Sequence, residues 1–181
     1  MSESAPLQIY LIPNPTLPEL RSIQASAKNQ LLQLAVNDLK KKPTELIIRD
    51  ILPSTDLGYT NEVWTKTYSS SNTYVDLVTD KEFTNKEMVI YGVLNNSAKP
   101  LSTLLRVKIG ADIRAIANLT PMYNNAEQAL GILSKPILFR TDTKFTISVY
   151  PKETGTEELV LLGYIIEKIG DTISAPTVMR A

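Results

Sequence analysis

The side chains of this chain that could carry out acid–base or nucleophilic chemistry are carboxylates, lysines, tyrosines and serines. Two carboxylates held roughly 5 to 10 Å apart could perform the acid and base steps of glycoside hydrolysis. The candidates on predicted strands are Asp50, Asp76, Asp112 and Glu167. Their positions along the chain pair none of them, so a carboxylate-dependent glycoside hydrolase stands as the third of three hypotheses for the function.

Histidine and cysteine are absent from the 181 residues, and this removes several classes of chemistry. Without them the chain cannot form a Ser-His-Asp triad, a thiolate nucleophile or a zinc site of imidazole and sulfur ligands. The 7 glycines are also too widely spaced for a dinucleotide fingerprint or a phosphate-binding Walker loop. We therefore predict no catalytic residue, no metal and no cofactor, and a protein that is not an enzyme.

Four aromatic residues fall in one short stretch: Tyr59, Trp64, Tyr68 and Tyr74. On a strand, Trp64 and Tyr68 would share a face because side chains alternate. If that face is exposed, sugar rings could stack on it; if it is buried, it belongs to the core or to an interface. The exposed alternative predicts a carbohydrate-binding β-sandwich module, which is the second hypothesis.

The charge balance argues against polyanionic partners. The 19 basic residues match the 19 acidic ones, whereas binders of nucleic acid or anionic membranes usually carry a basic surplus. The one basic run, Lys40, Lys41 and Lys42, falls where a helix is predicted to end, and cations there offset the exposed carbonyls. Because neither a secretory signal nor about 20 consecutive apolar residues are present, we expect a soluble, cytoplasmic protein with no nucleic-acid and no membrane partner.

The first residues combine prolines with apolar side chains. Four prolines favour an extended path: Pro6, Pro13, Pro15 and Pro18. Between them lie the apolar residues Leu7, Ile9, Tyr10, Leu11 and Ile12. An extended apolar segment seldom stays in water, so we expect an arm that lies on its own domain or on a neighbouring subunit.

A long amphipathic helix is predicted next. Thr16 and Glu19 have the spacing of a capping box, and Pro18 suits the first turn. Apolar residues then recur three and four apart at Leu20, Ile23, Ala27, Leu31 and Leu34. The lysines at 40–42 and Pro43 mark the end, which predicts a helix of about 25 residues. Its apolar face packs either on its own domain or on another subunit, and residues 1–43 form the first segment of the chain.

The remainder has the pattern of a β domain over residues 44–170. Short runs rich in Val, Ile, Thr and aromatic residues are separated by turn signals. The runs cover residues 45–51, 62–68, 73–78, 87–94, 103–109, 113–118, 137–140, 144–150 and 159–167. This number of strands predicts a mainly β fold, an antiparallel β-sandwich that is jelly-roll-like, followed by an extended tail over residues 171–181.

Two of these strands predict their own surroundings. In residues 144–150, Phe145, Ile147 and Val149 alternate with polar residues, which indicates one buried and one wet face. Residues 159–166 are apolar on both faces, so we expect a central strand or one whose outer face is covered by another element or subunit. Gly163 interrupts it and indicates a bulge or a close approach.

An extended arm, a helix and a β-sandwich with these last strands resemble the capsid decoration or cement proteins of tailed phages. The resemblance lies in the architecture of residues 44–170, with strands at 136–140, 144–152 and 158–167. It implies a virion protein, assembled in the host cytoplasm, often a trimer that clamps neighbouring capsid subunits through arms and loops. No residue-level function follows from it.

The first hypothesis is therefore a non-enzymatic structural protein. Its partners would be further copies of itself, as a homo-oligomer, and a capsid or other assembly protein. Contacts would bury apolar surface of the arm, the helix and the sheet. The predicted interface residues are Leu7, Ile9, Tyr10, Leu11, Ile12, Leu20, Ile23, Leu31 and Leu34.

Overall fold

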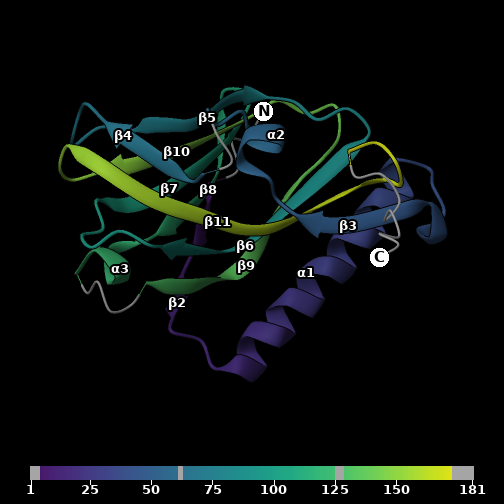
Figure 1. The fold of residues 1–181 in the computed structure, drawn as a ribbon, viewed down its shortest axis with the longest axis horizontal. Helices are drawn as coiled ribbons and strands as arrows, with labels where there is room; N and C mark the ends of the chain where they lie inside the picture. Colours follow the sequence, from purple (N-terminus) through teal and green to yellow (C-terminus); the bar gives the residue numbers. More distant parts are fainter. Residues whose placement is uncertain (1–4, 61–62, 125–128, 173–181) are drawn as a thin grey trace, which may run out of the picture.

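The computed structural model describes residues 5–60, 63–124 and 129–172 of the chain. Two β-sheets lie face to face, and one long helix crosses the outer face of one of them (Figure 1). The predicted tail over residues 171–181 falls, from residue 173 onward, outside the described residues. The prediction of a mainly β, sandwich-like protein with one long helix is confirmed.

The elements follow one another along the chain with short connections. The helices are α1 (Leu17–Asp38), α2 (Pro53–Leu57) and α3 (Thr120–Asn124), with a 3-10 turn η1 (Pro43–Glu45). The strands are β1 (Leu7–Ile9), β2 (Leu11–Pro13), β3 (Leu46–Asp50), β4 (Thr65–Tyr68), β5 (Val75–Lys81), β6 (Lys86–Asn95), β7 (Ser102–Ile109), β8 (Asp112–Asn118), β9 (Leu130–Phe139), β10 (Phe145–Pro151) and β11 (Gly155–Lys168).

The strands pair in a nested pattern. One sheet, sheet A, has the order β1-β8-β7-β10-β5, and the other, sheet B, has the order β2-β9-β6-β11-β3, with β4 on the first residues of β11. Four antiparallel pairs nest inside one another: β3 with β11, β5 with β10, β6 with β9, and β7 with β8. The chain therefore behaves as one long hairpin that has been rolled up into two sheets.

The main core fills the space between the two sheets. Phe145 of β10 packs against Phe139 and Phe83, with ring centroids 4.6 and 5.2 Å apart. The predicted inward residues of β10, Phe145, Ile147 and Val149, are all buried. The predicted wet face of this strand is wrong, because Ser148 is 0% exposed and donates a hydrogen bond of 2.7 Å to Asp76 on β5.

The start of α1 agrees with the capping prediction and its end does not. The backbone N–H and the hydroxyl of Thr16 donate to the Glu19 carboxylate at 2.8 and 2.7 Å. The helix has 22 residues and ends at Asp38, and Lys40 adopts a left-handed φ of 55°. The lysines at 40–42 therefore follow the helix instead of forming its last turn.

A second core lies between α1 and the outer face of sheet B. Ala27, Leu31 and Ala35 of the helix are fully buried. They belong to one cluster with Val89, Tyr91, Tyr164 and Ile166 of β6 and β11. The helix thus packs on its own chain, and this explains why residues 159–166 are apolar on both faces.

The residues of the predicted arm form two short strands of the sandwich. β1 pairs in parallel with β8 in sheet A, and β2 pairs antiparallel with β9 in sheet B. The chain crosses from one sheet to the other at Tyr10, whose backbone N–H donates to the Ser134 hydroxyl at 3.1 Å. The sequence predicted an extended segment here but not its pairing into two strands, because short edge strands leave little periodicity.

Candidate functional site

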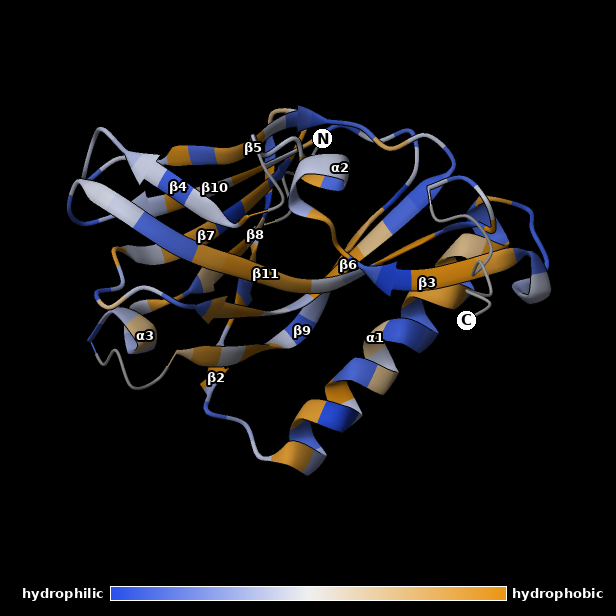
Figure 2. Ribbon diagram, in the orientation of Figure 1, coloured by the Kyte–Doolittle hydropathy of each residue, from blue (hydrophilic) through white to orange (hydrophobic). Residues whose placement is uncertain are grey.

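Four large apolar side chains near the N-terminus are exposed to solvent. We call the surface they form the N-terminal apolar strip. It consists of Leu7, Tyr10, Ile12 and Leu17, which are 42%, 71%, 43% and 57% exposed. Figure 2 shows apolar colour on β2 and on the first turn of α1. Large apolar side chains that gather on a surface are typical of sites of molecular contact.

The strip arises from the way the N-terminal strands sit on the sandwich. Ile9 and Leu11 are 2% and 8% exposed and point into the main core. Of the five predicted interface residues in the arm, these two are therefore used within the chain, and Leu7, Tyr10 and Ile12 remain accessible. Leu17 completes the strip and was missed, because the helical pattern was counted from Leu20.

Two residues of the strip, Leu7 and Ile12, lie on edge strands of the two sheets. β1 ends the strand order of sheet A and β2 ends that of sheet B. Each is only 3 residues long, and an edge strand has one row of backbone N–H and C=O groups turned away from the sheet. Apolar side chains and backbone groups at a sheet edge are thus presented together.

The predicted interface residues of the helix are mostly used within the chain. Leu31 is 0% exposed, and Leu20 and Ile23 are partly buried against the same second core. Leu34 is half-buried. The helix therefore contributes Leu17, at its first position, to the accessible apolar surface.

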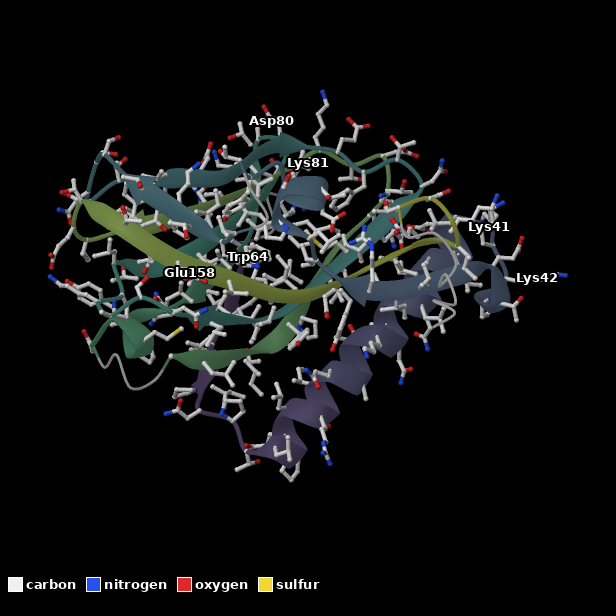
Figure 3. All side chains as sticks on the ribbon, in the orientation of Figure 1. Lys41, Lys42, Trp64, Asp80, Lys81 and Glu158 are labelled. Atoms are coloured by element: carbon white, nitrogen blue, oxygen red, sulfur yellow. The ribbon has the colours of Figure 1, made fainter. Side chains whose placement is uncertain are left out.

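The four aromatic residues proposed as a ligand face do not form one face. Tyr68 is 1% exposed, and its hydroxyl donates to Glu157 at 2.8 Å, so it cannot stack on a sugar. Trp64 is half-buried beside β11 and meets the ring of Tyr59 edge-on at 5.5 Å (Figure 3). Tyr74 belongs to the neighbourhood of sheet A, where its ring lies 5.3 Å from that of Tyr150. The turn between β4 and β5 carries the chain from one sheet to the other, and this separates Tyr74 from the other three aromatic residues.

The four candidate carboxylates of the hydrolase hypothesis are divided between the two sheets, with Asp76 and Asp112 in sheet A and Asp50 and Glu167 on the paired strands β3 and β11 of sheet B. Asp50 is exposed at the end of β3. Asp76 on β5 accepts a hydrogen bond from Ser148, and Asp112 on β8 pairs with Arg114 at 2.9 Å, with two other strands of sheet A between them. Asp76 and Asp112 each have a local partner, and the strand order does not bring these three acids to one cleft.

Glu167, the fourth carboxylate, is part of a buried ion-pair network. It is 0% exposed and contacts Arg49 at 2.9 Å and Lys86 at 2.8 Å. Burial acts to raise its pKa, but the hydrogen bonds from Arg49, Lys86 and Thr172 outweigh it and lower the pKa to about 2. Arg49 also holds Asp56 of α2 through two bonds of 2.6 and 2.8 Å. The network fastens α2 and β3 to the last strand, a structural role.

A second buried carboxylate, Glu157, organises the opposite end of β11. It is 0% exposed and accepts hydrogen bonds from four residues. The donors are the Tyr68 hydroxyl at 2.8 Å, the Asn95 amide at 2.7 Å, the Leu101 N–H at 2.6 Å, and the N–H and hydroxyl of Ser102 at 3.1 and 2.5 Å. This carboxylate ties β4, β6 and β7 to the start of β11.

A shallow depression of about 380 Å³ lies on the surface beside this network. It is lined by Thr65, Asn96, Ser97, Ala98, Lys99, Leu101, Gly155, Thr156 and Glu158. Its polar groups are engaged with one another: Asn96 donates to Glu158 at 3.1 Å, and the Ser97 hydroxyl accepts from the Glu158 N–H at 2.7 Å. The depression therefore offers few free polar groups to a ligand.

No protein-family model, curated protein or solved structure matches this chain. Within residues 5–60, 63–124 and 129–172, the helices include none with the length and apolar character needed to cross a membrane. The class that the fold defines is a mainly β protein with two packed sheets and one helix on the outside.

Proposed function

We propose that this protein is a non-enzymatic structural protein that assembles through the N-terminal apolar strip, as a homo-oligomeric component of a virion shell. The nested pairing of eight strands supports the jelly-roll form of the sandwich. Among these eight, the first strand, β3, pairs with the last, β11, and the other three pairs nest inside this one. Jelly rolls are common in viral capsid proteins and also in lectins. The topology therefore agrees with the proposal and leaves carbohydrate binding as its competitor.

The observation that carries the proposal is the strip itself, with Tyr10 71% exposed. Burying the exposed parts of these four side chains would contribute roughly 3 to 6 kcal/mol. Association costs at least about 4 kcal/mol in lost freedom of motion, so the strip alone supports only weak pairing. Weak contacts repeated around a shell become strong together, and this is why we propose an assembly and not an isolated tight dimer.

The proposal is tested by light scattering of the purified protein and by sedimentation with assembled capsid shells. Tyr10→Ser and Leu17→Ser, combined, should reduce oligomer formation and shell binding without changing the fold. Val63→Ser is the matched control, since Val63 is 51% exposed and lies outside the strip. A wild-type protein that stays monomeric and does not bind shells would contradict the proposal.

Carbohydrate binding is the second candidate, and Trp64 is the residue that favours it. Its ring is half-buried, and with Tyr59 it offers one aromatic contact in place of the wider face expected from sequence. Glycan-array binding that Trp64→Ala abolishes and Tyr74→Ala leaves unchanged would support this function. Binding that is indifferent to Trp64 would remove it.

A further inference from the structure

Glu87 is a carboxyl group buried beneath the helix without a base in direct contact. The residue is 0% exposed on β6, and among the described residues neither of its carboxyl oxygens meets a hydrogen-bond donor of good geometry. A buried carboxylate without a partner is costly, and such a group usually takes up a proton instead. Glu87 is therefore a group whose charge state matters to whatever covers it.

The elements packed around Glu87 supply one acid and one distant base. Asp38, the last residue of α1, faces it from the helix. β11 offers the apolar Ile166, which is the register partner of Glu87. Beyond the end of β9 lies Arg140, whose side chain is 64% exposed and pairs with Asp38 at 3.6 Å. The base is thus solvated and shared, and it does not form an ion pair with Glu87.

Other cations near the helix end are directed elsewhere. Lys86, the neighbour of Glu87 on β6, pairs with Glu167 at 2.8 Å. Lys41 and Lys42 lie at the periphery of the molecule, away from the sheet (Figure 3). The carbonyl groups at the C-terminal end of a helix carry partial negative charge, so α1 itself adds to the unfavourable field at Glu87.

We propose that Glu87 and Asp38 form a proton-operated latch between sheet B and the C-terminal end of α1. One proton held between the two carboxyl groups keeps this end of the helix docked. Loss of the proton to solvent leaves two facing carboxylates, whose repulsion separates the last turns of α1 from the sheet. Opening exposes apolar surface of the second core around Val89 and Ile166. The inference does not depend on the proposed function.

The direction of the latch follows from the environment of Glu87. Burial, and then the Asp38 carboxyl group, raise the pKa of Glu87 to about 8, while the Thr141 backbone and Arg140 oppose this rise without overcoming it. In the open state the side chain meets water and its pKa returns toward the ordinary 4.5. The closed state therefore binds the proton more tightly. Its advantage over the open state is fully present below pH 4.5 and is lost progressively as the pH rises from 4.5 through about 8.

Hydrogen–deuterium exchange on the full chain tests the latch, with Glu87→Gln measured beside the wild type at pH 4 and pH 9. Comparison at the same pH cancels the intrinsic dependence of exchange on pH. At pH 4 the amides of residues 31–39 should exchange equally in the two proteins, because Glu87 is protonated in both the closed and the open state. At pH 9 those of the wild type should exchange at least about a hundredfold faster, since each pKa unit between the ordinary 4.5 and about 8 corresponds to a factor of ten. Glu82→Gln, at an exposed acid, is the control and should behave as wild type.

Equal exchange of wild type and Glu87→Gln at pH 9 would overturn the proposal, as would a difference of the same size at pH 4. If Glu87→Gln does not fold, Asp38→Asn replaces it, because removing the facing charge should slow the exchange of residues 31–37 at pH 9 relative to wild type. A carbon NMR titration of the Glu87 carboxyl group in the wild type gives an independent readout. A midpoint near 8 supports the latch, and a midpoint near 4.5 overturns it.

Discussion

A Cβ atom on Gly163 of β11 would lie 2.1 Å from the carbonyl oxygen of Val89 on β6. The register between these two strands shifts between Leu162 and Gly163, so the backbones approach at the irregularity. This contact lies beneath α1, in the strand that both cores share. It makes the position a sensitive test of how tightly sheet B is built.

Gly163→Ala should lower the free energy of unfolding by about 3 kcal/mol, because the added methyl group meets backbone that cannot move aside. Gly110→Ala is the comparison: Gly110 has a φ of 57° but open space around it, so only conformational strain of about 1 kcal/mol is expected. Urea denaturation measures both. Equal losses in the two variants would mean that β6 and β11 can separate at little cost.

Glu157→Gln should lower the free energy of unfolding by about 2 to 3 kcal/mol, since one carboxylate oxygen is replaced by an amide that opposes the donors around it. Glu158→Gln is the matched control on the same strand, where the side chain is only half-buried, and should change stability by less than about 0.5 kcal/mol. Thermal unfolding at neutral pH compares the pair. A small effect at both positions would contradict the anchoring role of Glu157.

We expect the free energy of unfolding to fall in acid because Glu167 becomes protonated. Its pKa is about 2 in the folded protein against an ordinary 4.5. Its contribution is therefore fully present well above pH 4.5 and is lost as the pH falls from that value toward 2. The loss should amount to about 1 to 3 kcal/mol. Unfolding measured between pH 2.5 and 7 should show a shallower pH dependence in Glu167→Gln than in wild type, and an unchanged slope would argue against the ion-pair network.

Leu31→Ala should lower the free energy of unfolding by about 2 to 4 kcal/mol, because it leaves a cavity in the second core. Leu34→Ala, at a half-buried position of the same helix, should have an effect of about 1 kcal/mol. Both were predicted interface residues from the sequence alone. If Leu34→Ala impairs shell binding while leaving stability unchanged, the result would support the prediction that Leu34 is an interface residue.

Local patterns in the sequence predicted most of the elements. The capping pair Thr16 and Glu19 placed the start of α1, since a capping box needs only residues three apart. Alternation in residues 144–150 identified the inward face of β10. The helices α2 and α3 were missed because each is a single short turn within a stretch read as a loop, and β1 and β2 were missed because edge pairing leaves little periodicity.

Only the residue types of the candidate site, and not their exposure, could be predicted from the sequence. The apolar character of residues 7–12 was plain in the sequence, but the division into the buried Ile9 and Leu11 and the exposed Tyr10 and Ile12 was not. That division depends on β8 and β9, more than 100 residues away along the chain. The aromatic hypothesis failed at Tyr68 for the same reason, since its hydroxyl partner Glu157 is distant in sequence.

The sequence by itself determined what chemistry is closed to this chain and which segments repeat with the period of a helix or a strand, because composition and periodicity are properties of neighbouring residues. Tertiary structure decided which faces are buried, which acids pair with a base and which carboxyl group lies under the helix without one. Glu87 and Glu167 are the same residue type on adjacent strands, with pKa values of about 8 and about 2. Only the groups that folding brings around each one distinguish them, since desolvation and Coulomb interactions act through space and not along the chain.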